Sequence, residues 1–333
     1  MPTKSDPLIC EVTRGTMVES RHRVHAMVCD ASGPVKTWGD PDLMFYPRSA
    51  IKFMQALPLV ESGAADAHKV DIAELALASA SHSGTATHVN AVCAWLKRIG
   101  LGADDLGCGP HLPYDVHAAH DLIRAGTPPT RVNNNCSGKH TGFLTTALHL
   151  GESTEGYLDP DHPVQRRLYD ILVAFGEQNL ADTGRGRDGC GIPVYGMTLT
   201  ALARAAQKMA DPAGLGEQRG TAVKRVLAAV MAEPFMVGGP ERFDTDVMGA
   251  LGGKAATKGG AEGVHIAILP EKGLGIALKA EDGEKRAADI AMAYLLTEAG
   301  VIDEAESRKL GRHLKPTIHN AAGDAVGTVR VAR

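Results

Sequence analysis

The sequence predicts an α+β fold, with an antiparallel sheet made from both ends of the chain and helices in the middle. Two observations predict it: short runs rich in strand-forming residues lie near both termini, and turn residues such as Ser32-Gly33-Pro34 and Pro270-Glu271-Lys272-Gly273 separate them. The strand candidates are 8–12, 24–29, 35–38, 264–269, 274–278 and a final hairpin over 318–331. Strands that come first and last, with helices between them, indicate this α+β class.

Helical periodicity begins at Pro47 and dominates the centre of the chain. Pro47 favours a helix start, and Pro58 is expected to bend or end that first helix. Further helix candidates are 72–80, 91–99, 141–150, 164–180, 198–209 and a C-terminal helix over 290–298 that stops at Gly300. We therefore expect one domain, with a sheet lobe of about 1–46 and 230–333 and a helical lobe of about 47–229.

The composition restricts the class of protein. The chain has 333 residues, 44% of them hydrophobic, and carries a net charge of -4 without any block of like charge. Neither nucleic acid nor an anionic membrane is indicated as a partner. The longest clean apolar run, 290–296, is too short to span a bilayer, and the polar segment 1–10 lacks the apolar run of a secretory signal. We expect a cytoplasmic protein whose six scattered cysteines form no disulfide framework.

The first motif with chemical content is Ser49-x-x-Lys52, just after Pro47. On a helix, residues three apart lie on one face, so the two side chains should be adjacent. A serine hydroxyl becomes a good nucleophile when a neighbour takes its proton, and a lysine can do so only as the neutral amine, which burial or a nearby cation favours. Taken alone the motif is weak, because a surface lysine one turn from a capping serine has the same spacing.

Two later motifs raise its specificity. Hydrolases with Ser-x-x-Lys carry a second serine motif and a Lys-Thr-Gly-like motif on a strand. Here Ser81-His82-Ser83-Gly84 follows a helix candidate, and Lys258-Gly259-Gly260 precedes the strand candidate 264–269. Taken separately, the Ser81 motif is equally typical of a polar loop, and the Lys258 motif of a solvated lysine between glycines. Their occurrence in the expected order favours a serine hydrolase.

A cluster of cysteine motifs occupies the middle of the chain. Asn134-Asn135-Cys136-Ser137-Gly138-Lys139-His140 is followed by Asp188-Gly189-Cys190-Gly191-Ile192-Pro193. The two cysteines could bind a soft metal such as Zn²⁺, with a neutral lysine as a further ligand. Alternatively, Cys136 is a thiol nucleophile with His140 as its base. In a purely structural interpretation, both cysteines are buried and Lys139 pairs with Asp188.

Together these motifs resemble the bacterial L-asparaginases that are similar to serine β-lactamases and penicillin-binding proteins. The resemblance covers about 12–280 and includes the motif Lys258-Gly259-Gly260-Ala261-Glu262-Gly263. It excludes the threonine-nucleophile asparaginases and the plant-type self-cleaving ones. The resemblance implies hydrolysis of L-asparagine to L-aspartate and ammonia, a homodimer, and a zinc ion whose role is left open.

The resemblance also implies roles for particular residues. Ser49 is the nucleophile, Lys52 is its base, and Ser81 and Lys258 form a second Ser–Lys pair. The implied zinc ligands are Cys136, Lys139 and Cys190, with water as a fourth. The candidates for substrate contact or tuning of the site are Arg48, His140 and Asp188.

The sequence departs from the penicillin-recognising relatives at two positions. Ser83 stands where those proteins have asparagine, and Gly259 where they have threonine. Both departures favour a small amide substrate over a β-lactam. The alternatives are another small-molecule amidase, such as a glutaminase-like enzyme, since one methylene is discriminated only weakly, or a non-catalytic zinc-binding relative.

Overall fold

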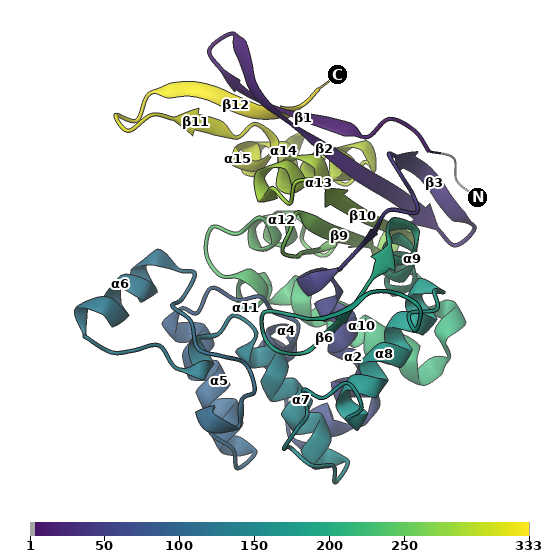
Figure 1. Cartoon of the computed structure of the whole chain (residues 1–333), viewed down its shortest axis with the longest axis vertical. Helices are drawn as coiled ribbons and strands as arrows, with labels where there is room; N and C mark the ends of the chain where they lie inside the picture. The colour runs from purple at the N-terminus through teal and green to yellow at the C-terminus, as the bar shows by residue number, and fades with distance from the viewer. Residues whose placement is uncertain (1–3, 333) are drawn as a thin grey trace.

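The computed structural model describes residues 4–332, so residues 1–3 of the polar N-terminal segment and residue 333 lie outside the described part. Its main sheet has eight antiparallel strands in the order β11-β12-β1-β2-β10-β9-β8, with β3 paired to β2 (Figure 1). The strands are β1 Leu8–Arg14, β2 Met17–Asp30, β3 Gly33–Trp38, β8 Ala256–Gly259, β9 Val264–Leu269, β10 Leu274–Ala280, β11 Thr317–His319 and β12 Ala325–Val331. The α+β prediction, with a sheet made from both chain ends, is confirmed.

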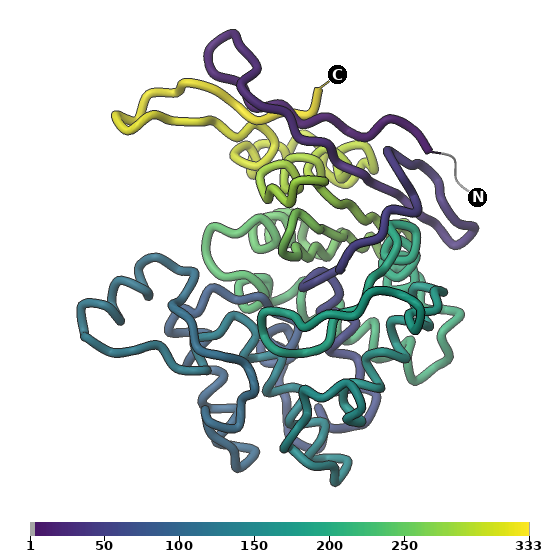
Figure 2. Tube along the Cα trace, in the orientation of Figure 1, coloured from purple at the N-terminus to yellow at the C-terminus, as the bar shows by residue number. Residues whose placement is uncertain are grey.

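The long strand β2 is the centre of this sheet. It pairs with β1, β3 and β10, so that Val28 lies opposite Ile276 of the C-terminal half. The first strand, β1, pairs on its other side with the last, β12, and Cys10 lies opposite Val331. Figure 2 shows the two ends of the chain running side by side along one edge of the molecule.

Both faces of the sheet are buried, because alternate residues of a strand point to opposite faces. On β9, Ile266 and Ile268 belong to one hydrophobic core, while Ala267 and Leu269 belong to the other. Helix α13 (Lys285–Glu298) packs on one face, and α9 (Leu199–Ala210) lies against β2, β9 and β10 in the core of the helical part. The sheet is therefore the middle layer between α13 and the helical lobe (Figure 1).

The helical lobe lies beneath the end of the sheet that carries β9 (Figure 1). Its elements are the 3-10 helices η1 Arg48–Ile51, η2 Ala103–Asp105, η3 Arg131–Asn133 and η4 Ala213–Leu215 and the helices α1 Lys52–Gln55, α2 Leu57–Glu61, α3 Ala64–Ala67, α4 Ile72–Ala78, α5 Ala86–Arg98, α6 Val116–Arg124, α7 Ser137–His149, α8 Pro163–Gly176, α9 and α10 Glu217–Ala232. After them, α11 Pro234–Gly238 leads to α12 Phe243–Leu251, whose buried Phe243, Val247 and Leu251 belong to the same hydrophobic core as α13. Short elements complete the chain: β4 Met44–Phe45, β5 Arg185–Arg187, β6 Pro193–Tyr195, β7 Met197–Thr198, η5 Pro270–Lys272, α14 Glu304–Lys309 and α15 Gly311–Leu314. Within residues 4–332 no helix has the length and apolar character needed to cross a membrane.

The helix expected to start at Pro47 is divided into three short pieces. The 3-10 helix η1 comes first, α1 follows it directly, and α2 begins at Leu57. Pro58 lies in the first turn of α2, where a missing backbone N–H costs nothing, so this proline begins a helix after the break instead of bending a continuous one. The first piece, η1, packs against β8 at the edge of the sheet.

Candidate active site

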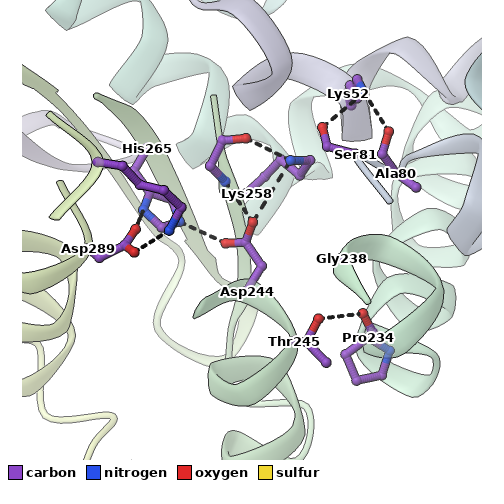
Figure 3. A network of polar contacts seen from close by, with 12 residues as sticks. Lys52, Ala80, Ser81, Pro234, Gly238, Asp244, Thr245, Lys258, His265 and Asp289 are labelled. Atoms are coloured by element: carbon purple, nitrogen blue, oxygen red, sulfur yellow. Dashed lines mark hydrogen bonds and ion pairs between the residues drawn. The ribbon is translucent and has the colours of Figure 1, made fainter. Parts of the chain in front are cut away.

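Ser49 and Lys52 lie on η1 and at the start of α1. In a 3-10 turn, residues three apart eclipse each other, which keeps the two residues on one side. Lys52 is 1% exposed, and its Nζ donates hydrogen bonds to the carbonyl oxygen of Ala80 at 2.5 Å and to Ser81 Oγ at 2.9 Å (Figure 3). Ser49 is half-buried and lines a cleft. The buried amine thus contacts the second serine directly.

Arg48, the residue before Ser49, has a strained backbone. Its φ of 52° is in the left-handed region, which costs a non-glycine residue about 1–2 kcal/mol. The side chain is held by Asp188, whose Oδ1 lies 2.6 Å from Arg48 Nε. Burial opposes ionisation of Asp188, but Lys139 and Arg48 outweigh it and lower the pKa of this carboxyl. The ion pair between these two candidates fixes the turn that presents Ser49.

The loop after α4 presents Ser81. The backbone N–H of Ser81 donates a hydrogen bond to the carbonyl oxygen of Val237 at 3.0 Å. The backbone N–H of His82 donates one to the carbonyl oxygen of Asn135 at 3.1 Å. Two backbone contacts to separate segments therefore hold the Ser81 hydroxyl over the amine of Lys52.

Lys258 reaches the site from β8, at the edge of the sheet. It is 1% exposed, and its Nζ donates to the carbonyl oxygen of Gly259 at 2.7 Å and lies 3.9 Å from Asp244 Oδ2 (Figure 3). Burial lowers the pKa of Lys258 to about 7, and Lys52 adds to this effect while Asp244 opposes it. Within residues 4–332 no hydrogen bond joins Lys258 to Ser81, so their pairing stays a prediction.

A glycine brings the sheet edge onto the nucleophile turn. A Cβ on Gly260 would lie 2.9 Å from the carbonyl oxygen of Pro47 and 3.2 Å from the backbone nitrogen of Ala50. Backbone therefore meets backbone here, and any side chain would push the two segments apart. Gly260 explains how the Lys258 strand can flank the start of η1 so closely.

These segments enclose a cleft of about 480 Å³, which Ser49 and Ser81 both line. Its wall includes Asn135 of the first cysteine motif and residues that sequence motifs did not reveal, among them Tyr114, Arg242, Asp244, His265, Lys285 and Asp289. Arg242 is of particular interest because, within the part of the chain that the structure describes, its guanidinium has no hydrogen bond or ion pair. No local motif surrounds it, since it precedes α12, far from both serines in sequence.

The predicted zinc ligands lie together in the interior. Lys139 Nζ is 3.1 Å from Cys190 Sγ, and Lys52 Nζ is 3.0 Å from Cys136 Sγ, with both cysteines 4% exposed. The neighbouring Cys190 thiol and burial raise the pKa of Cys136 to about 12, while the neighbouring Cys136 thiol and the charge of Lys139 lower the pKa of Cys190 to about 5. Burial opposes protonation of Lys139, but Cys190 and Cys136 outweigh it and raise the pKa of this lysine. The cluster therefore combines a thiolate with an ammonium, as well as a thiol.

The donor set fits zinc if the lysine is counted. Two sulfurs and a nitrogen are donors that Zn²⁺ accepts, provided that each loses its proton on binding. Among residues 4–332, no group of three or more His, Cys, Asp and Glu side chains is placed to hold a metal ion. A zinc ion at this cluster would therefore require Lys139 as a third protein ligand.

His140 lies apart from the cleft. It is fully buried, its Nδ1 is 2.6 Å from the hydroxyl of Tyr157, and its Nε2 has no hydrogen-bond partner among the described residues. Burial holds its pKa well below the usual range, so this imidazole is neutral. The structure does not bring His140 into the cleft that Ser49 and Ser81 share.

A mixed helix and sheet fold with two serines at one cleft and two buried lysines beside it has the layout of a hydrolase. The chain belongs to the L-asparaginase II family, whose model matches residues 10–331. This membership defines an amidohydrolase. No curated protein matched the chain.

Three solved structures are also similar to it. A putative β-lactamase from Bacteroides dorei DSM 17855 is 16% identical over 78% of this chain and 88% of its own, with a TM-score of 0.41. A β-lactamase from Mycobacterium bovis is 16% identical over 83% of this chain and 94% of its own, with a TM-score of 0.41. A β-lactamase from Sphaerobacter thermophilus DSM 20745 is 15% identical over 84% of this chain and 91% of its own, with a TM-score of 0.40.

Proposed function

We propose that the protein hydrolyses L-asparagine to L-aspartate and ammonia. The observation that supports this most is the joint position of Ser49 and Ser81 at one cleft, with the buried amine of Lys52 against Ser81, in a chain of the L-asparaginase II family. Such an arrangement suits acyl transfer, in which a hydroxyl attacks an amide and a neighbouring base takes its proton.

In the proposed reaction, Lys52 takes the proton of Ser49 while the Ser49 oxygen bonds to the side-chain amide carbon. Backbone N–H groups at the start of η1 and beyond β8 flank the cleft and are the donors that we assign to the oxyanion. When the C–N bond breaks, Ser81, which accepts a hydrogen bond from Lys52, passes a proton to the departing nitrogen. Water then attacks the Ser49 ester, loses a proton to the same groups, and releases L-aspartate.

The decisive test is a substrate panel at neutral and alkaline pH. We expect release of ammonia from L-asparagine and markedly less from L-glutamine. A β-lactam ester should not be hydrolysed, and the absorbance of its ring monitors this. Faster release from L-glutamine would instead establish the glutaminase-like alternative. A folded protein that turns over none of the three and still binds zinc would be the non-catalytic relative.

We further assign recognition of the substrate α-carboxylate to Arg242. A guanidinium without a partner at the cleft wall can bind a carboxylate through two hydrogen bonds. Arg48 and Asp188, which pair with each other, stay our candidates for the rest of the amino acid.

Arg242→Gln is expected to raise KM for L-asparagine about tenfold to a hundredfold, because a hydrogen bond to a charged group contributes about 1.5–3 kcal/mol. Steady-state kinetics should show a much smaller change in kcat. With β-alaninamide, which lacks the α-carboxylate, wild type and variant should behave alike. Arg225→Gln, at a surface ion pair with Asp66, is the control that should change neither constant. Equal losses on both substrates would contradict the assignment.

We propose that Cys136, Lys139 and Cys190 bind zinc, which supplies a fixed positive charge beside the cleft when bound. Elemental analysis of protein purified without chelator should give about one zinc per chain, as expected of one site with three protein ligands and a water. Cys190→Ser should lose the metal, since it removes the thiolate, and Cys93→Ser, at an exposed cysteine, should keep it. Absence of zinc from the native protein, with no rise in unfolding temperature when zinc is added, would remove this proposal.

The cytoplasmic location and the homodimer belong to the same proposal. All six cysteines are free in the described structure, as is usual in a reducing compartment. Sedimentation of the purified protein tests the homodimer directly.

A further inference from the structure

Asp244 and His265 form a largely buried polar pair at the wall of the cleft, and none of the motifs contains either residue. Asp244 lies in the first turn of α12, where the helix dipole favours a carboxylate. Its Oδ1 is 2.8 Å from His265 Nε2, on β9, so this nitrogen carries the proton that the carboxylate accepts (Figure 3). Only 12% of the Asp244 side chain and 2% of that of His265 are exposed.

The second carboxylate oxygen faces strand β8. Oδ2 accepts a hydrogen bond from the backbone N–H of Gly259 at 2.9 Å and lies 3.9 Å from Lys258 Nζ. Since β8 is the last strand of the sheet, the outward N–H of Gly259 has no further strand to pair with. Asp244 therefore caps the sheet edge and holds the lysine at the same point.

We propose that Asp244, oriented by His265, is the positioning residue that sets the place and charge of Lys258 beside Ser49 and Ser81. This inference rests on the proposed function for its catalytic meaning, but not for the contact itself. Without the carboxylate, the end of β8 loses a hydrogen bond and a buried ammonium loses its counter-ion, which is costly in the interior.

The charges around Lys258 give the direction of the expected change. Asp244 and, from farther away, Cys136 favour the ammonium, while Lys52 and Arg242 oppose it. Helix α10 offers only apolar side chains to the core, and Arg48 on η1 is paired with Asp188. Removing the carboxylate charge therefore lowers the pKa of Lys258 further below its ordinary value.

The test is a titration of Lys258, followed through its Cε chemical shift in lysine-labelled protein and assigned with Lys258→Met. In Asp244→Asn the titration should move about 1 pH unit lower, the usual size for loss of an opposite charge at this distance. Asp246→Asn is the matched control, because Asp246 lies on the same helix and pairs instead with Arg312 and His313. It should leave the titration unchanged.

The kinetic arm uses L-asparagine. In Asp244→Asn, kcat should fall about tenfold or more, as for a displaced catalytic group. Comparison of wild type with Lys258→Met identifies the limb of the pH–rate profile that depends on Lys258. In Asp244→Asn, this limb should lie at lower pH than in wild type. In the Lys258→Met background, Asp244→Asn should cost far less, because both changes act through one group.

Several outcomes would overturn the proposal. An unchanged Lys258 titration in Asp244→Asn is one, and an equal loss of kcat with and without Lys258 is another. If Asp244→Asn does not fold, Asp244→Glu keeps the charge but displaces it, and wild-type kcat in that variant would also contradict positioning. A wild-type protein inactive on L-asparagine would remove the proposed function, whereas the titration would still decide the role of Asp244.

Discussion

Ser49→Ala is expected to lower kcat for L-asparagine by about 10⁴-fold or more, as loss of a covalent nucleophile does in serine hydrolases. The half-buried hydroxyl lines the cleft, and within residues 4–332 its oxygen has no side-chain hydrogen bond. Its removal should therefore leave the fold and the unfolding temperature unchanged. Stopped-time ammonia assays and thermal unfolding measure the two quantities on the same sample.

The thiol alternative provides the contrasting variant. Cys136 is buried, and its sulfur contacts Lys52 rather than His140 among the described hydrogen bonds. Cys136→Ala should therefore leave more activity than Ser49→Ala. If Ser49→Ala keeps more than a few per cent of the activity and Cys136→Ala keeps none, the nucleophile is the thiol.

Lys52→Met is expected to lower kcat/KM by about 10²–10⁴-fold, the contribution of a positioned general base. Methionine fills most of the same volume, but the hydrogen bond to Ser81 Oγ disappears. The unfolding temperature should change little, because an apolar chain of similar size removes the desolvation cost of the buried amine as well as its hydrogen bonds to Ala80 and Ser81.

Lys97→Met, on the exposed side of α5, controls for the change of charge and should retain full activity. A combined loss of activity and stability in Lys52→Met would point instead to a structural lysine. Retention of activity, with the fold intact, would remove Lys52 as the base.

The strands near the two termini were accessible to sequence reasoning because alternation marks them directly. Val264 to Leu269 and Leu274 to Ala280 form the expected hairpin, and the final hairpin turns where Gly323 lies. Strand β8 shows no such alternation, since it has four residues and ends in glycine. The sequence pattern does not predict helix α10, although this helix is 16 residues long, because Gly220 and a charged first turn interrupt its apolar periodicity.

The site was predictable only where short motifs carry it. Lys52 contacts Ser81, and Ser49 lines the same cleft as Ser81. Lys139 contacts Cys190, and Cys136 contacts Lys52. The contact between Ser49 and Lys52 and the roles of all these residues stay predictions. By contrast, Asp244 and Arg242 reach the cleft through the tertiary packing of α12 against β8, and no spacing in the sequence encodes that approach. His140 shows the converse, because a residue within a motif can point into the core and contact Tyr157 there.

The pairing of β2 with strands from the far end of the chain affects how the molecule is made. Met27 and its partner Ala277 are 250 positions apart, and β12 joins β1 later still. At ordinary elongation rates a ribosome needs about 10–50 seconds to add those residues, and throughout that time the nascent N-terminal strands have open edges. Such edges are templates for unwanted pairing, so we expect the emerging chain to depend on chaperones until its last strands leave the exit tunnel.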